Sequence, residues 1–365
     1  MTSDDLLRPD PAATAPAPVA EPSPFPPDEG VTLVPTGVPV LPLPEPIVAA
    51  TWQTLPAADP WCPPDVLAHG PAWLAGVATA DVHVFADDVA PGWRAVAASV
   101  RGRSHAHRGD HREDAFAVRR ADGLVVLCAA DGAGSAALSR VGAELACRET
   151  ADRVLAKLAP ERAYLRERQR DELAHAVGHA IGLSVWETCR LLHDVAAASG
   201  TTPSAFRCTL LVAAWYASDA SEIVVTSQVG DGAIVIWRRD GSAARLGDAD
   251  SGDFAGEVRT FVPDAQAPER ASHVRVTDAG GLTALALLTD GVDDPVHPIE
   301  QTAQTLLAQW RTGADTALPR VTQTFRGPVL GPADAGPALA TWLGFERRGE
   351  NDDRTAVVMA RVDAG

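Results

Sequence analysis

The sequence has few cysteines, and their arrangement argues against both a disulfide framework and a zinc site. Its 365 residues include only five, an odd number without any CxxC spacing, at positions 62, 128, 147, 189 and 208. Disulfide frameworks and zinc sites normally need paired or closely spaced cysteines. Three of the five fall in apolar strand or helix patterns, so we expect reduced core residues in a cytoplasmic protein.

A basic surface and a long apolar run are also missing. The formal net charge is −17, whereas nucleic-acid binding normally demands a basic face. The N-terminus lacks the basic start and apolar segment of a signal peptide, and no unbroken apolar stretch has membrane-spanning length. We therefore expect a soluble cytoplasmic protein with neither nucleic acid nor membrane among its partners.

Proline, by contrast, is concentrated at one end. Residues 1–65 hold 17 of the 29 prolines, and proline removes backbone donors and blocks both helices and sheets. We expect a Pro/Ala-rich arm over 1–65, largely disordered or extended, a segment over 66–92 that packs on the folded domain, and the domain itself over 93–363. The arm is either a docking segment, through the polyproline-like stretch 41–46, or a solvated tail.

Acidic residues stand repeatedly at the ends of apolar strands. The apolar run 124–130 leads directly into Asp131 and Gly132. A partly buried carboxylate is costly unless it has a cationic partner. The pattern recurs at Glu113-Asp114, Gly230-Asp231-Gly232, Thr289-Asp290-Gly291 and Asn351-Asp352-Asp353. Carboxylates that converge at one end of a sheet would make an oxygen-rich site suited to Mg²⁺ or Mn²⁺.

Hydrophobic periodicity predicts alternating groups of strands and helices. Strands are expected at 93–100, 124–130, 206–216, 222–229, 233–238, 272–277 and 283–289, with a last strand after Asp353. Helices are expected at 138–158, 173–198, 298–312 and 333–344. Residues 101–111 are expected to form a polar loop rich in histidine, and the acidic segment 248–257 either a mobile flap or a simple surface loop.

Six of these motifs, taken in order, resemble the metal-dependent protein phosphatase 2C family, particularly its bacterial branch. They are Glu113-Asp114-Ala115-Phe116, Asp131-Gly132-Ala133-Gly134, Cys208-Thr209-Leu210-Leu211, Gly230-Asp231-Gly232, Thr289-Asp290-Gly291 and Asp352-Asp353-Arg354-Thr355. One Asp-Gly dipeptide is only a common turn, but six motifs in family order, spread over residues 93–363, are specific. The resemblance implies an α+β fold, a four-layer αββα sandwich in which two mainly antiparallel sheets are flanked by helices.

The resemblance also implies an activity and its residues. It implies a Ser/Thr protein phosphatase that hydrolyses phosphoserine and phosphothreonine through a water bridging two Mn²⁺ or Mg²⁺ ions, with a third ion in some bacterial members. The implied metal group is Asp131 bridging both ions, Glu113 and the Gly132 carbonyl on one, Asp290 and Asp352 on the other, Asp231 toward the third, and Asp114 orienting metal-bound water. Asp353 is the alternative to Asp352.

The phosphate-binding residue departs from the family pattern. In much of the family an arginine stands four residues before the first acidic residue, and here that position is Gly109. Arg108 and Arg112 are the two alternatives, because a phosphate needs a cationic, preferably bidentate, neighbour. Ala133 stands where some relatives have a histidine proposed as general acid.

The implied substrates are phosphoproteins made by a partner Ser/Thr kinase in a signalling pathway, with docking through the proline-rich arm. Two alternatives differ in class. One is an inactive phosphatase-fold module that binds or regulates, which the altered arginine position favours. The other is a hydrolase of small phosphoesters.

Overall fold

The computed structural model describes residues 53–77, 79–121, 123–247, 258–314, 316–323, 325, 327–331 and 334–362. These residues belong to one compact unit, Thr51–Gly365. The expectations for most of the proline-rich arm and for the acidic segment 248–257 lie outside the described residues.

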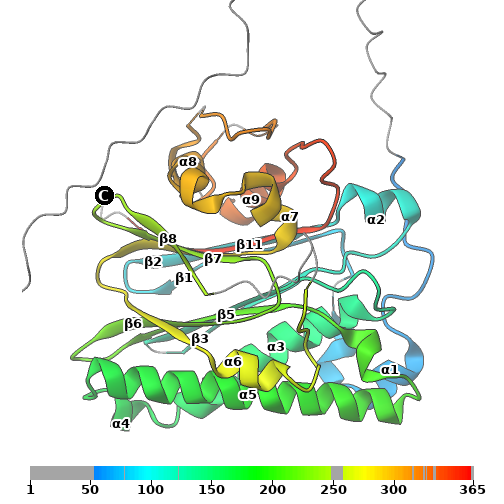
Figure 1. The fold of residues 1–365 in the computed structure, drawn as a ribbon, viewed down its shortest axis with the longest axis horizontal. Coiled ribbons are helices and arrows are strands. Elements are labelled where there is room, and N and C mark those ends of the chain that lie inside the picture. Colours follow the sequence, from blue (N-terminus) through cyan, green and yellow to red (C-terminus); the bar gives the residue numbers. More distant parts are fainter. Residues whose placement is uncertain are drawn as a thin grey trace, which may run out of the picture. The chain divides into compact units, whose positions relative to one another are not determined.

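Two antiparallel sheets face each other in this unit (Figure 1). The first sheet has the order β1-β2-β11-β10-β7-β8, formed by Val82–Ala90, Trp93–Val100, Arg354–Arg361, Leu282–Leu288, Ala233–Arg238 and Ala243–Leu246. The second sheet has the order β3-β4-β5-β6-β9, formed by Ala115–Ala121, Leu124–Ala130, Leu210–Ala217, Glu222–Val229 and Arg275–Asp278. Every pairing is antiparallel, so strand starts and strand ends alternate along each sheet.

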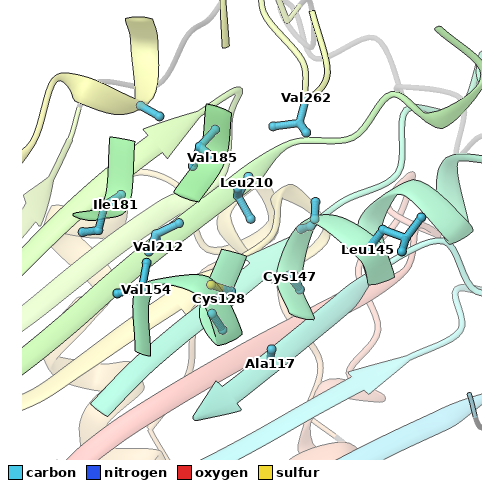
Figure 2. Close-up of a cluster of buried hydrophobic side chains, with 14 of the residues drawn as sticks. Ala117, Cys128, Leu145, Cys147, Val154, Ile181, Val185, Leu210, Val212 and Val262 are labelled. Atoms are coloured by element: carbon cyan, nitrogen blue, oxygen red, sulfur yellow. The ribbon is translucent and has the colours of Figure 1, made fainter. Parts of the chain in front are cut away.

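The central strands are buried on both faces, which explains their continuous apolar sequences. In β4, Leu124, Val126, Cys128 and Ala130 join the cluster that faces the helices, and the residues between them join the cluster between the sheets. Side chains alternate across a strand, so one apolar run supplies two cores. Figure 2 shows the helix-facing cluster, where Cys128 lies near Cys147.

Helices cover the outer face of each sheet (Figure 1). Helices α3 (Ser139–Leu158), α5 (Arg170–Ala198) and α6 (Ala267–Ser272) pack on the second sheet. Helices α7 (Asp290–Val296), α8 (Ile299–Thr312) and α9 (Ala335–Leu343) pack on the first. The shorter helices are α1 (Pro64–His69), α2 (Arg103–Arg108), α4 (Arg162–Leu165), η1 (Ala72–Gly76) and η2 (Pro203–Phe206). The four-layer αββα sandwich is therefore confirmed.

Searching the described residues for a bilayer-spanning helix finds none with the necessary length and apolar character.

The secondary-structure expectations fail mainly at short and edge elements. Trp93 was expected to begin the first strand, but β1 precedes it and pairs with β2. β1 lies at the sheet edge and is largely exposed, and its apolar residues are interrupted by His83, Asp87 and Asp88. The expected loop 101–111 contains α2, which ends at Gly109 with a φ of 77°. The strand expected from residue 206 begins at Leu210, because residues 203–206 form η2.

The cysteine expectation can be tested through thiol reactivity. All five cysteines are free and buried, and burial raises the pKa of Cys62 to about 11 and of Cys189 to about 12. Thiolate is the reactive form, so Ellman's reagent at pH 8 should show no rapid phase with native protein and five reacting thiols in guanidinium. A rapid native phase that disappears in Cys62→Ser would show that the segment around Cys62 opens readily.

Candidate metal centre

The acidic motifs converge at one end of the sandwich. Asp131 follows the end of β4, where Ala130 pairs with Ala115 at the start of β3. Asp290 follows the end of β10, where Leu288 pairs with Ala356 near the start of β11. Antiparallel pairing thus places the Glu113-Asp114 motif beside Asp131 and the Asp352-Asp353 motif beside Asp290.

Hydrogen bonds join the two sheets at this end. The Thr289 hydroxyl donates to Asp114 Oδ2 over 2.8 Å and accepts from the Thr355 amide over 2.9 Å. Thr355 in turn donates to Ser99 Oγ over 2.6 Å. All of these groups except the Asp114 carboxylate are neutral, and Thr289, Thr355 and Ser99 are almost fully buried. The link fixes one oxygen of Asp114 and leaves Oδ1 buried without a hydrogen-bond partner.

The carboxylates in this region repel one another. Burial and then the charge of Asp353 raise the pKa of Asp114 to about 7. Burial, Asp290 and Asp114 raise the pKa of Asp131 well above its usual range. Burial, Asp231 and Asp114 do the same for Asp290, and Asp352 adds to both shifts. Like charges at close range disfavour the ionised form unless a cation intervenes.

Among the described residues, no cationic side chain is a principal influence on the pKa of Asp131 or of Asp290. This charge imbalance and the unpaired Asp114 Oδ1 fit a bound cation. The donors are all oxygens, which is the ligand set that Mg²⁺ and Mn²⁺ prefer. The chemistry of the donor set therefore fits the implied metal ions.

Glycines let the acidic turns approach closely. A Cβ on Gly132 would lie 2.8 Å from Ser139 Cβ and 2.9 Å from Glu113 Cβ, so Gly132 packs directly against the Glu113 side chain. A Cβ on Gly232 would lie 2.6 Å from the carbonyl oxygen of Leu288, two residues before Asp290. Only residues without a side chain fit these two positions.

Asp231 lies on the turn that contacts the end of β10. The Gln228 amide donates to the carbonyls of Gly230, Asp231 and Gly232 over 3.1 to 3.2 Å and holds the turn in place. Burial, followed by the nearby acidic residues Asp294 and Asp293, raises the pKa of Asp231 to about 6, although Arg245 opposes this. Asp231 also raises the pKa of Asp290, which places both carboxylates in one electrostatic cluster.

Asp353 has a different environment from its neighbour Asp352. Its carboxylate is 1% exposed and accepts from the amides of Gly102 and Glu113 over 2.5 Å each, and from His105 Nδ1 over 2.9 Å. Burial alone would raise the pKa of Asp353, but the bond and charge of His105 outweigh burial and lower it. Asp352 is exposed and, among the described residues, accepts a hydrogen bond from the Asp353 amide alone, over 2.8 Å.

His105 is the cationic partner of Asp353. Burial would lower its pKa, but the bond to Asp353 and the charges of Asp353 and Glu113 raise it to about 9. The candidate ligand atoms of His105, Asp352 and Asp353 all lie within 4.8 Å of one another. His105 and Asp353 already satisfy each other, so within this group Asp352 is the residue open to a further ligand.

The two arginines proposed for phosphate binding lie in different places. Arg112 is buried and donates to Ser99 Oγ over 2.8 Å and to the carbonyl of Asp114. Arg108 is exposed, pairs with Asp110 over 2.5 Å, and lines a cavity of about 590 Å³ beside Glu113. Arg112 therefore supports the loop from within, whereas Arg108 is accessible to a substrate.

Sequence reasoning missed two residues of this region. Thr289 belongs to the Thr289-Asp290-Gly291 motif, but the motif does not reveal that its hydroxyl binds Asp114. Its position directly before Asp290 is the only indication that the sequence gives of a role at this site. Arg140 lines the same cavity as Arg108, but in the sequence it is an ordinary helical arginine, and no motif identifies it.

Comparisons with known proteins agree with the fold. Residues 101–325, more than half of the chain, match the family model described as protein phosphatase 2C. No curated protein sequence matches the chain. Similar solved structures include RsbX in complex with magnesium, at 11% identity and a TM-score of 0.43, covering 77% of this chain and 100% of that one.

Two further solved structures among the matches are serine/threonine phosphatases. The Mycobacterium tuberculosis phosphatase PstP/Ppp has 15% identity, a TM-score of 0.41, and coverage of 74% of this chain and 98% of that one. The catalytic domain of PstP in complex with two manganese ions has 16% identity, a TM-score of 0.41, and coverage of 74% and 99%.

The contrast between Asp353 and Asp352 predicts different effects on stability. At pH 7 Asp353 and His105 are both charged, because the pKa of the carboxyl is lowered and that of His105 is about 9. Asp353→Asn removes the charge that keeps His105 protonated and replaces a charged acceptor of two backbone amides, so it should lower the free energy of unfolding by about 3–5 kcal/mol, as breaking a buried ion pair does. Asp352→Asn, the exposed control, should change it by about 0.5 kcal/mol or less. Urea unfolding with EDTA measures both, and equal effects would contradict the assigned difference.

Proposed function

The chain belongs to the protein phosphatase 2C family, and we propose that it is a Mn²⁺- or Mg²⁺-dependent Ser/Thr protein phosphatase. The observation that carries this proposal is the cluster of carboxylates at one end of the sandwich, whose pKa values are raised by burial and mutual repulsion. Such a cluster is costly for an apoprotein and suits divalent cations.

The metal-holding residues are proposed from position and chemistry. Asp131 would be shared by two ions, with Glu113 and the Gly132 carbonyl on one, and Asp290 and Asp352 on the other. Asp231 would contribute to a third. When bound, the ions would supply positive charge for the phosphoryl oxygens and acidify a water for attack at neutral pH.

Asp352 is preferred to Asp353 as a ligand because of the hydrogen bonds around each. Both carboxylate oxygens of Asp353 already accept hydrogen bonds from the protein, while Asp352 is exposed. Asp353 would act instead by holding the amide of Glu113, and thereby the start of β3, in position. We therefore propose Asp352, and not Asp353, as the metal ligand of this family motif.

Asp114 and Arg108 would act on water and substrate respectively. Thr289 holds Asp114 Oδ2, and Oδ1 remains available to accept from a water and orient it. Arg108 carries a positive charge at the cavity and would bind the phosphate. Arg112 is not proposed as a phosphate ligand, because it is buried beneath Asp114.

The wider biological setting remains our proposal. Phosphoprotein substrates of a partner kinase, a signalling role in the cytoplasm, and docking through residues 1–65 follow from the family resemblance and from the proline-rich composition. The domain bounds 93–363 and the packing segment 66–92 are proposed on the same basis. An inactive binding module and a small-molecule phosphoesterase are the alternative outcomes of the activity test.

Activity should require both the metal and its bridging carboxylate. We expect purified protein to hydrolyse a phosphothreonine peptide and p-nitrophenyl phosphate with Mn²⁺, and EDTA to abolish turnover. Asp131→Asn should reduce kcat by at least about 100-fold, more than the loss typical of a residue outside the ligand shell.

The matched control is Asp171→Asn, an exposed carboxylate on α5, which should retain full activity. Turnover that survives both EDTA and Asp131→Asn would contradict the metal-dependent mechanism. Folded protein without turnover under any metal would favour the binding module, and hydrolysis of the small ester alone would favour the phosphoesterase.

A further inference from the structure

A segment outside the family-matched residues borders the cavity beside the metal centre, which its residue Asp59 lines. This strap, residues 55–61, precedes the matched region 101–325 and runs against α2 and the residues that follow it. Its backbone is held by polar contacts from the domain. The Leu55 amide donates to the Ala106 carbonyl over 2.8 Å, and the Ala58 amide donates to the Gly109 carbonyl over 3.2 Å.

Side chains of the domain bind the carbonyls of the strap. Arg101 Nη2 donates to the Leu55 carbonyl over 3.1 Å, and His111 Nε2 lies 2.7 Å from the Asp59 carbonyl oxygen. At its C-terminal end Trp61 packs on the helix-facing core, and Cys62 is buried in that core. The strap is therefore attached along its length.

The strap lies over Gly109, the position at which the family pattern has an arginine. Gly109 has a φ of 77°, and a Cβ there would lie 3.2 Å from the Pro56 carbonyl oxygen and 3.6 Å from Leu55 Cβ. A positive φ favours glycine, and the strap restricts the space for a side chain. The backbone conformation and the strap therefore both disfavour a larger side chain at this position.

The strap supports another arginine at the same cavity. Arg140, at the start of α3, donates through Nε to the Trp61 carbonyl over 2.6 Å and through Nη2 to the Pro60 carbonyl over 3.2 Å. Its Nη1 donates to the Ala137 carbonyl over 2.9 Å. Arg140 and Glu113 line the cavity together, and Glu113 is the foremost nearby charge that raises the pKa of Arg140 against the effect of burial.

Arg140 has N–H groups that can donate to a further acceptor. A guanidinium has five N–H donors, and three of those of Arg140 are used, one on each nitrogen. One N–H donor remains on each of Nη1 and Nη2. The three hydrogen-bond partners of Arg140 among the described residues are neutral carbonyls. Two terminal donors on one planar group match two oxygens of a phosphate.

We propose that the strap is a working part of the substrate site, because it positions Arg140 to bind the phosphate of a phosphorylated substrate beside the metal centre. This inference rests on the proposed phosphatase function. In it, the Trp61 and Pro60 carbonyls fix the guanidinium plane, and Arg140 binds the phosphate together with Arg108.

Substitutions at Arg140 should affect substrate binding more than turnover. Arg140→Ala should raise the KM for the phosphothreonine peptide, and the Kd for inorganic phosphate in Mn²⁺-supplied protein, by about 10- to 100-fold, because a charge-assisted bidentate contact is lost. Arg140→Lys keeps the charge without the planar pair of donors and should show a smaller increase. Steady-state kinetics and calorimetric titration of phosphate provide the two readouts.

The control is Arg153→Ala, which removes another partly buried arginine of α3 that pairs with Glu149 and Glu187 away from the cavity. It should leave KM and Kd within twofold of wild type. If KM and Kd of folded Arg140→Ala and Arg140→Lys also stay within twofold, the assignment is overturned. Wild-type protein without turnover contradicts the proposed phosphatase instead, and phosphate titration then still tests Arg140.

The role of the strap is tested by a double-mutant cycle. Trp61→Ala removes core packing at the end of the strap without altering a cavity-lining side chain. We expect it to raise KM by about two- to tenfold in the wild-type background and to have little further effect with Arg140→Ala, since groups that act through each other are not additive. No change in KM, or an equal increase in both backgrounds, would show that the strap does not position Arg140.

Discussion

The candidate site depends on the buried carboxylate of Asp353. This one side chain binds the backbone at Gly102, before α2, and at Glu113, before β3, and it pairs with His105 within α2. Asp353 itself directly precedes β11, a central strand of the other sheet. A single carboxylate therefore ties the first acidic motif to the last, through its hydrogen bond from the Glu113 amide. The hydrogen bond and charge of His105 keep Asp353 ionised, which burial would otherwise oppose.

The chain separates supporting groups from groups left open for ligands. Asp353, Thr289 and Arg112 have hydrogen-bond partners within the protein and are buried. Asp352 is exposed, one oxygen of Asp114 has no hydrogen-bond partner, and among the described residues no cation is a principal influence on the pKa of Asp131 or Asp290. Buried polar groups are normally satisfied, so the unpaired Asp114 Oδ1 beside this acidic cluster fits a bound ligand. This contrast separates two adjacent aspartates that sequence alone treats alike.

Sequence predicted the long, strongly patterned elements and the order of the acidic motifs. Helices α3 and α5 and the central strands emerge from apolar periodicity, and the sandwich follows from the family resemblance. β1 and α2 are not recognised in this way, because the exposed edge strand mixes apolar and polar residues and the short helix is polar. Arg140 was also beyond reach, since its position at the cavity results from three-dimensional contacts with residues some 80 positions earlier in the chain.

The division of the acidic cluster between the two sheets has a consequence for stability. Glu113 and Asp131 belong to one sheet, while Asp290 and Asp352 adjoin the other. A cation held by residues of both would bind the assembled sandwich and not its separated halves, so mass action would couple its binding to the cohesion of the sheets. The thermal stability of the fold would then depend on the concentration of divalent ions. Depletion of these ions would lower the stability of the protein as well as its activity.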